Sequence, residues 1–365
     1  MMFPALDHLR RAQGRWLEQL GYGPLRSPCW VVAEGAGLRL LAFQGKECPG
    51  PALLLVPGPI KRSYIFDLVP RASVVRACRE RGLSVYLLEW TDPGPDSANF
   101  RLEDYAGRLL LWARDAVAAV HGEDRVVLVG HSLGGTLAAL HAARYPGALA
   151  ALVLLEAPLA FDDPVDAFAP LLKASPSTRR WLVGTAVVPG SELTLAAVLA
   201  APEAFFWHRW GDALASAADP PSRDLHLRVL RWTLDELALP TPLVRDVLQD
   251  LYREDRFRNG DLMLAGDAVG LPAIDVPILG VFEENSRVVP PGSLVAAVAE
   301  TASPDRRVLA YDGDAGVMLR HVGVLVGRHA HERLWPEILA WIKDLPDRGG
   351  GSRGPTRRRH KAAQR

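Results

Sequence analysis

The residues best arranged for chemistry in this sequence surround Ser132, within the run GHSLGG at positions 130–135. The apolar run RVVLV (125–129) precedes the motif, and the alanine-rich segment TLAALHAARY (136–145) follows it. A serine on a tight strand-to-helix turn points its hydroxyl away from the sheet, and glycines on either side remove side chains that would collide there. The following helix would offer backbone N–H groups, including that of Leu133, to a developing oxyanion. The pattern predicts Ser132 as a catalytic nucleophile; the alternative is a glycine-rich turn with an incidental serine.

Short apolar runs alternate with longer helical patterns on both sides of this motif. Apolar strands that alternate with helices predict an α/β fold with a mostly parallel sheet covered by helices on both faces. The expected strands are 52–56, 84–88, 125–129, 152–155, 277–282 and 307–311, and the expected helices are 69–81, 102–121, 134–144 and 293–302. Leu6, Leu9, Trp16 and Leu20 recur at helical spacing, which predicts an amphipathic helix at the start.

The segment 161–270 breaks this alternation. It is helical in pattern, rich in Trp and Pro and without a convincing buried strand, so we expect a helical cap inserted into the core. The other expected segments are an N-terminal helix and lead-in (1–30), the two parts of the core (31–160 and 271–345) and a disordered basic tail (346–365). Aromatic residues of the cap are expected in its own core or along an apolar acyl pocket. They are Phe161, Phe168, Trp181, Phe205, Phe206, Trp207, Trp210 and Trp232.

The composition excludes several classes of protein. The 365 residues include 42 Lys+Arg, 42 Asp+Glu and 49% hydrophobic residues, which argues against a disordered, collagen-like or disulfide-stapled chain. Cys29, Cys48 and Cys78 lack metal-ligand or redox spacing, and no segment reads as a signal peptide or membrane span, so we expect a soluble cytoplasmic protein. Neither histidine–carboxylate clusters nor phosphate loops are present, so no metal or organic cofactor is expected.

Several segments resemble the poly(3-hydroxyalkanoate) synthases, in particular their catalytic subunit of this length. The likeness covers nearly all of residues 30–343. It rests on LLLVPGPIKRSYIFDLV (53–69), LEDYAGRLL (102–110), GHSLGGT (130–136), DLYREDRFRNGDLMLAGDAVGLPAIDVPILGVF (250–282) and HVGVLVGRHAHERLWPEILAWI (321–342). The resemblance implies an α/β-hydrolase fold with a cap, and acyl transfer through a triad of nucleophile, histidine and aspartate.

The first departure from the family is the nucleophile itself. The family uses cysteine where this chain has Ser132, and His321, in RHVG at 320–323, matches the family's catalytic histidine. A serine hydroxyl is hardly ionised at neutral pH and therefore depends more heavily on an adjacent general base. An acyl group that passes from a thioester to serine becomes an oxoester with little drive toward another alcohol. Serine therefore favours hydrolysis over polymerisation.

The second departure concerns the triad acid. Ser286 stands where the family has its aspartate, and a hydroxyl cannot stabilise an imidazolium as a carboxylate does. Glu156, at the end of the strand that follows the nucleophile helix, is our first choice for the orienting acid, because strand ends on this face line the site. Glu284 is the second choice, and Asp312 or Asp314 the third. A structural salt bridge is the alternative for Glu156.

The third departure lies in the loop VPGPIK (56–61), which would supply the second oxyanion donor. Pro59 has no N–H to donate. Ile60, which aligns with the isoleucine of the family's IN pair, is therefore the expected donor beside Leu133. The alternative is that this loop is a plain turn and that Leu133 acts alone.

Three functions are compatible with these residues. Hydrolysis of apolar or 3-hydroxyacyl esters and thioesters is preferred. The first alternative is poly(3-hydroxyalkanoate) synthesis from hydroxyacyl-CoA with a partner subunit, as in the related synthases. The second is a catalytically weakened relative that binds polymer granules or a synthase partner. The basic tail would suit an anionic partner, but a solvated tail is the simpler interpretation, and no nucleic-acid partner is expected.

Overall fold

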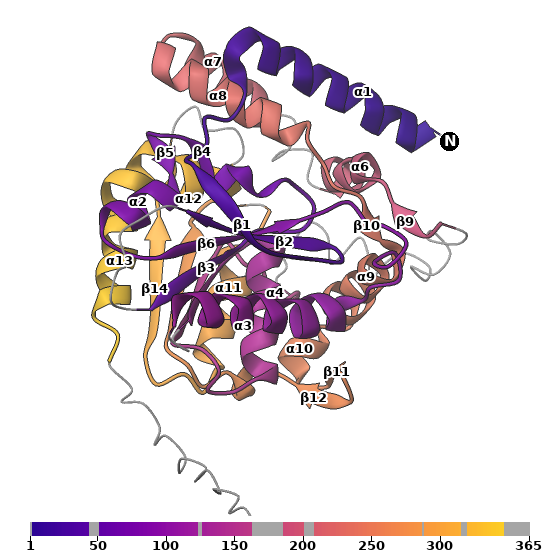
Figure 1. Cartoon of the computed structure of the whole chain (residues 1–365), viewed down its shortest axis with the longest axis vertical. Coiled ribbons are helices and arrows are strands. Elements are labelled where there is room, and N and C mark those ends of the chain that lie inside the picture. Colours follow the sequence, from indigo (N-terminus) through magenta and orange to yellow (C-terminus); the bar gives the residue numbers. More distant parts are fainter. Residues whose placement is uncertain are drawn as a thin grey trace, which may run out of the picture.

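An eight-stranded sheet forms the centre of the computed structural model (Figure 1). The structure describes residues 2–43, 51–122, 126–162, 185–200, 208–286, 288–314 and 320–346. The strand order is β1-β2-β6-β3-β7-β8-β13-β14; pairing is parallel from β6 to β14 and antiparallel from β1 to β6. The strands are β1 (Cys29–Gly35), β2 (Leu38–Phe43), β3 (Ala52–Val56), β6 (Val85–Trp90), β7 (Val126–His131), β8 (Ala151–Leu155), β13 (Ile278–Glu283) and β14 (Arg306–Tyr311).

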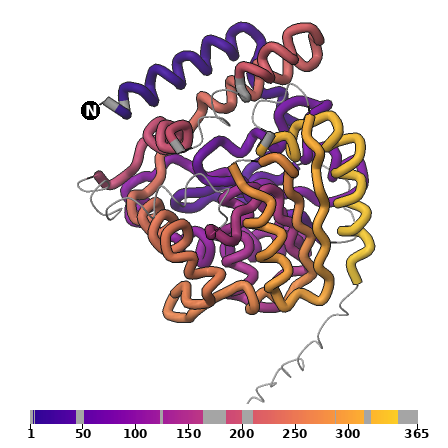
Figure 2. The backbone as a smooth tube through the Cα atoms, turned by 180° about the vertical axis from the view of Figure 1, so that it is seen from behind, coloured from indigo at the N-terminus to yellow at the C-terminus, as the bar shows by residue number. Residues whose placement is uncertain are grey.

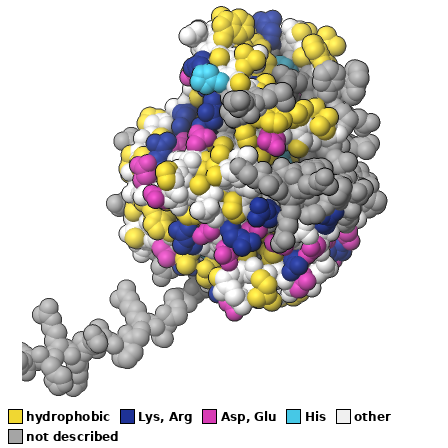
Figure 3. Space-filling model, turned by 90° about the vertical axis from the view of Figure 1, so that its right-hand side faces the viewer, with side chains coloured by type: hydrophobic (Ala, Val, Ile, Leu, Met, Phe, Trp, Pro, Cys, Tyr) yellow, Lys and Arg dark blue, Asp and Glu magenta, His cyan; other side chains and the backbone are white. Residues whose placement is uncertain are grey.

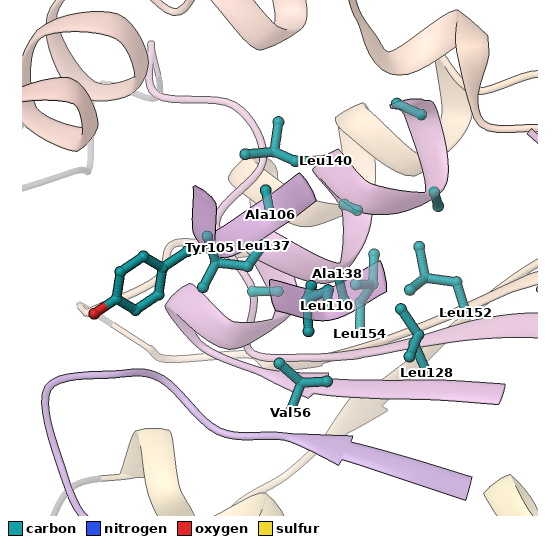
Figure 4. Packing of buried hydrophobic residues seen from close by; sticks show 14 of the residues in the cluster. Val56, Tyr105, Ala106, Leu110, Leu128, Leu137, Ala138, Leu140, Leu152 and Leu154 are labelled. Atoms are coloured by element: carbon teal, nitrogen blue, oxygen red, sulfur yellow. The ribbon is translucent and has the colours of Figure 1, made fainter. Parts of the chain in front are cut away.

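Helices cover both faces of this sheet. Leu54 and Val56 of β3 belong to one apolar cluster, whereas Leu53 and Leu55 of the same strand belong to the other, and all four are fully buried. Figure 4 shows the first cluster, in which strand residues such as Val56 pack below helix residues. The helices of the first cluster are α3 (Leu110–His121), α4 (Leu133–Arg144) and α11 (Pro291–Ala299), and those of the second are α2 (Val74–Glu80), α12 (Arg320–Val326) and α13 (Trp335–Lys343). Burial on both faces explains why the strands read as unbroken apolar runs.

The N-terminal helix α1 (Met2–Leu17) lies along helices that come from the middle of the chain (Figures 1 and 2). It contacts α6 and α8, and the Asp7 carboxylate accepts the Ser191 N–H at 2.8 Å. Elements of this part are α6 (Gly190–Ala200), α7 (His208–Ala217), α8 (Pro220–Thr233), α9 (Thr241–Asp246), α10 (Arg256–Asn259), β9 (Val187–Val188), β10 (Leu239–Pro240), β11 (Leu262–Leu264) and β12 (Asp267–Val269). Single turns or wide helical turns are η1 (Glu18–Tyr22), η2 (Ser63–Phe66), η3 (Asp104–Leu109), η6 (Val247–Arg253), η7 (Leu271–Ala273) and η8 (Ala330–Leu334).

All six strands expected from the sequence are present, and the structure differs from the expected elements in three places. The strands β1 and β2 were not expected, because an antiparallel edge strand such as β1 is largely exposed and lacks the apolar run of a central strand. The expected helix at 69–81 is instead a short pair, β4 (Asp67–Val69) and β5 (Ala72–Ser73), followed by α2, whose start is capped by the Ser73 hydroxyl. The segment 161–270 also contains the two short strand pairs β9–β10 and β11–β12.

Some expectations fall outside the described residues and stay predictions. They concern the basic tail, Cys48 and five cap aromatics, namely Phe168, Trp181, Phe205, Phe206 and Trp207. The cap boundaries stay predictions for the same reason, because 163–184 and 201–207 lie within them.

The surface carries both signs of charge. On the face shown in Figure 3, basic and acidic side chains are interspersed, in keeping with the equal totals in the sequence. None of the helices within the described ranges combines the length and apolar character that crossing a bilayer requires.

Candidate active site

Ser132 occupies a sharp turn between β7 and α4. Its backbone has φ 56° and ψ −135°, a conformation that non-glycine residues seldom adopt. The Ser132 N–H donates to Leu155 O at 3.0 Å, and the Ser132 carbonyl accepts the N–H of Gly135 at 2.8 Å. These bonds hold the strained turn at the carboxyl end of β7, beside the end of β8. Such strain persists only where the surroundings enforce it, and it concentrates at functional sites.

Three glycines permit the turn because a side chain at any of them would collide with neighbouring atoms. A Cβ on Gly134 would lie 2.5 Å from Pro57 O, and one on Gly130 would lie 2.8 Å from Gly134 O. A Cβ on Gly135 would lie 2.5 Å from the Cβ of Ala157. The helix that follows Ser132 therefore packs closely against the ends of β3 and β8, and the glycine pattern of the motif has a steric cause.

Glu156 and His321 form a buried pair near this turn. The Glu156 Oε2 lies 3.3 Å from His321 Nδ1, although 165 residues separate them in the sequence. Glu156 directly follows β8, has φ 48° and is fully buried. Its Oε1 accepts the backbone N–H of Glu283. The carboxylate is thus fixed in place by a group from the next strand of the sheet.

Burial shifts the pKa values of both members of this pair toward their neutral forms. Loss of solvation lowers the pKa of His321 below its ordinary value. Loss of solvation likewise raises the pKa of Glu156, and the hydrogen bonds from Glu283 and Ser286 offset part of that increase. The imidazole is therefore neutral near pH 7, which is the form that accepts a proton.

His131 connects the nucleophile turn to the histidine segment, a role that our sequence analysis did not anticipate. Its Nε2–H donates to the backbone carbonyl of His321 at 3.0 Å, and the two imidazole rings lie 4.7 Å apart between centroids. Phe66 packs edge-on against His131 at 6.3 Å. Burial, followed by the neighbouring His321, lowers the pKa of His131 to about 3, so its ring stays neutral. The only signal in the sequence was its position directly before Ser132.

The hydroxyl of Ser132 and the imidazole of His321 are not hydrogen-bonded to each other within the described residues. Residues 315–319, which lead into His321, lie outside those residues. Catalytic hydrogen bonds are often long without substrate and shorten in the substrate complex. The proton-transfer contact between these two side chains therefore stays a prediction.

The alternative acids lie elsewhere. Glu284 and Asp312 are exposed to solvent. The Asp314 carboxylate accepts the hydroxyl of Tyr311 and the backbone N–H of His329. Of the acids considered from the sequence, Glu156 is the one whose carboxylate contacts the imidazole of His321 in the described part of the chain.

The loop after β3 lies beside the serine turn. A Cβ on Gly58 would lie 3.8 Å from the backbone N of Leu133, and Trp90 Nε1–H fixes the loop by donating to Pro57 O at 2.8 Å. The Ile60 carbonyl accepts the N–H of Leu237 at 2.9 Å. The loop is thus held from both sides, and the oxyanion roles of the Leu133 and Ile60 N–H groups stay predictions.

Glu236 anchors the same loop through Lys61. Lys61 Nζ lies 2.9 Å from Glu236 Oε1, which also accepts the guanidinium of Arg10 on α1. Glu236 is almost fully buried, and burial lowers the pKa of Lys61 to about 8. The N-terminal helix is therefore connected to the candidate oxyanion loop by a chain of ion pairs. Within the described ranges, no group of three or more His, Cys, Asp or Glu side chains is arranged to hold a metal ion.

Comparison with known proteins shows what this chain is similar to. A family model of the alpha/beta hydrolase fold matches residues 51–216. The poly(3-hydroxyalkanoate) polymerase subunit PhaC of Haloferax mediterranei is 28% identical over 332 residues, which make up 89% of this chain and 65% of that protein. The PhaC subunit of Allochromatium vinosum is 26% identical, and the match covers 80% of each chain. The chain is thus similar to PhaC subunits over most of its length and to the alpha/beta hydrolase fold over residues 51–216.

Solved structures agree on the fold of this PhaC-like chain. Proline iminopeptidase of Mycobacterium smegmatis has a TM-score of 0.50 and 15% identity, and it matches 87% of this chain and 98% of its own. A thermophilic esterase from Thermogutta terrifontis has the same TM-score and identity, with 88% and 98% covered. The expected α/β-hydrolase fold class is therefore confirmed. The PhaC-like chain spans less than two thirds of the Haloferax relative and of its homologue in Haloarcula marismortui.

Proposed function

We propose that this PhaC-like chain is a serine-dependent acyl-transfer enzyme that hydrolyses apolar or 3-hydroxyacyl esters and thioesters. The observation that carries the proposal is the strained Ser132 turn with the buried Glu156–His321 pair beside it. A nucleophile, a neutral imidazole and a carboxylate on its second nitrogen are the three groups that serine-based acyl transfer needs. The three scattered cysteines suit a reducing compartment, and we place the enzyme in the cytoplasm.

The proposed reaction begins with removal of the Ser132 proton by His321 Nε2. The serine oxygen forms a bond to the acyl carbonyl carbon, and the N–H groups of Leu133 and Ile60 stabilise the negative oxygen of the tetrahedral intermediate. The imidazolium then gives its proton to the departing thiolate or alkoxide, which leaves an acyl-serine. Water repeats the sequence, releasing the acid and restoring the serine.

Glu156 would support both proton transfers by acting on His321 Nδ1. In its ionised form, Glu156 holds the tautomer in which Nδ1 carries the proton and Nε2 is open to accept one. Because burial raises the pKa of Glu156 to about 8, the ionised fraction that supports catalysis grows as the pH rises toward that value. When the imidazole becomes charged, the carboxylate stabilises it as an ion pair inside a dry site, where charge–charge attraction is strong.

A serine-reactive fluorophosphonate tests the nucleophile. We expect a single covalent adduct on Ser132 and none in Ser132→Ala. An intact, folded protein that gives no adduct would leave only the third possibility, a weakened relative that binds polymer or a partner.

The outcome with 3-hydroxybutyryl-CoA separates hydrolysis from polymerisation. Polymerisation is the second candidate, because the relatives at 24–29% identity are named as polymerase subunits. Release of CoA with free 3-hydroxybutyrate and no polymer supports hydrolysis. Growth of an ester-linked chain would replace the proposal of hydrolysis with one of polymer synthesis. Polymer synthesis through Ser132 requires that water be kept from the acyl-serine.

A further inference from the structure

A hollow of ≈ 450 Å³ lies between the segment that leads into β1 and helix α2, and it includes none of the residues proposed for catalysis. Its charged lining is mostly basic, with Arg26, Arg76 and Arg79 and a single acid, Glu80. Leu25, Pro28 and Pro70 form its apolar part.

The guanidinium groups of Arg79 and Arg26 are not fully satisfied by the protein. The Nε of Arg79 is buried and has no hydrogen-bond acceptor, and Arg79 makes no ion pair within the described residues. The Nε and Nη2 of Arg26 are also buried without an acceptor. Its Nη1 lies 3.7 Å from Glu89, a carboxylate that Arg39 already contacts at 2.5 Å. Guanidinium charges that no carboxylate fully neutralises make the potential of the hollow positive, and this favours a bound anion.

The neighbouring acids do not supply that anion. Glu80 is exposed and pairs with Arg76 at 2.8 Å, one helical turn away. Asp67 is buried and accepts hydrogen bonds from the hydroxyls of Ser27 and Ser73. The region thus has three carboxylates and four guanidinium groups. The carboxylates are those of Glu80, Asp67 and Glu89, and the guanidinium groups are those of Arg26, Arg39, Arg76 and Arg79. The positive charge of the hollow is therefore not cancelled.

We propose that this hollow binds the phosphate group of a small molecule. Guanidinium groups match the oxygens of phosphate in geometry, and two incompletely paired guanidiniums suit a dianion better than a single carboxylate. Arg26 and Arg79 donate to the phosphate oxygens, and Arg76 adds positive charge at the rim. The volume exceeds that of phosphate alone, so the organic part of a phosphate ester lies against Leu25, Pro28 and Pro70.

Titration calorimetry of the full chain with inorganic phosphate and with ADP, at constant ionic strength set by KCl, tests this site. We expect saturable binding of at least one probe, with the dissociation constant raised about tenfold or more in Arg79→Gln and in Arg26→Gln, as for loss of a charge-assisted hydrogen bond. Arg223→Gln is the matched control, because Arg223 is an exposed arginine of α8 outside the hollow, and it should bind as the parent does.

The two probes distinguish the sources of the phosphate. Binding of both supports a site that free phosphate can fill, whereas binding of ADP alone supports a site for phosphate esters. Absence of saturable binding by either probe overturns the proposal. Equal affinity in the parent, Arg79→Gln and Arg26→Gln also overturns it, provided that circular dichroism shows the variants folded. Because binding is measured directly, the result does not depend on the activity of Ser132.

Discussion

Replacing Glu156 by glutamine tests the geometry of the buried pair directly. The Glu156 Oε1 accepts the Glu283 N–H, so the glutamine oxygen must take that position and its NH₂ group must face His321 Nδ1, where Oε2 now lies at 3.3 Å. An NH₂ donor cannot face an Nδ1–H donor. The imidazole therefore adopts the tautomer with its proton on Nε2, which cannot accept the proton of Ser132.

The expected loss of activity follows from that tautomer. The corresponding amide substitution in a serine triad lowers kcat by about ten-thousandfold. We expect Glu156→Gln to lower kcat on a p-nitrophenyl ester by about a thousandfold to ten-thousandfold, equivalent to about 4–5 kcal/mol of transition-state stabilisation. KM should change little, because the carboxylate is fully buried behind the imidazole.

The control for this experiment is Glu284→Gln. Glu284 was the second candidate for the acid and is exposed, so the same chemical change there should leave kcat within about twofold, as is usual for surface substitutions. A folded Glu156→Gln variant with the kcat of the parent would refute the assigned role of Glu156. A large loss in Glu284→Gln would move the acid to that residue.

Three further predictions concern stability and positioning. Burial raises the pKa of Glu156 from 4.5 to about 8, so ionisation of this group favours the unfolded state. The free energy of unfolding of Glu156→Gln minus that of the parent, measured by urea titration, should therefore rise between pH 4.5 and about 8. A difference that does not change with pH would contradict the pKa shift. Gly134→Ala should lower the free energy of unfolding by about 1–3 kcal/mol, because its Cβ would lie 2.5 Å from Pro57 O. The control Gly211→Ala, whose Cβ would have no tertiary contact within 4 Å in the described part of the chain, should leave the free energy of unfolding unchanged or raise it by about 0.5–1 kcal/mol. Equal urea midpoints for the two variants would contradict this prediction. His131→Leu removes the donor to His321 O and should lower kcat about 10- to 100-fold. His131→Gln keeps an N–H donor and should have a kcat between those of the parent and His131→Leu. Identical kcat values for the two variants would argue against a positioning role for His131.

The central strands were predictable because each is apolar on both faces, and two-sided burial leaves that pattern in the sequence itself. The edge strand β1 and its antiparallel neighbour β2 were not predicted; β1 is largely exposed and pairs on one side only. Similarly, the pair β4–β5 interrupts what reads as a helix at 69–81, because the buried Asp67 binds the Ser73 hydroxyl that also caps α2. Elements shaped by one or two tertiary contacts leave little trace in local sequence.

The sequence alone determined the serine turn, because its steric demands are local: a backbone with positive φ and glycines where the chain approaches itself are visible in GHSLGG and its neighbours. Tertiary structure decided what surrounds that turn. Glu156 was our first choice from its place at a strand end, but only folding brings it to His321, buries the carboxylate and supplies the Glu283 N–H that holds it. The contact from His131 to the His321 carbonyl likewise exists only in three dimensions, since 190 residues separate its partners, and no local pattern encodes a distance of that kind.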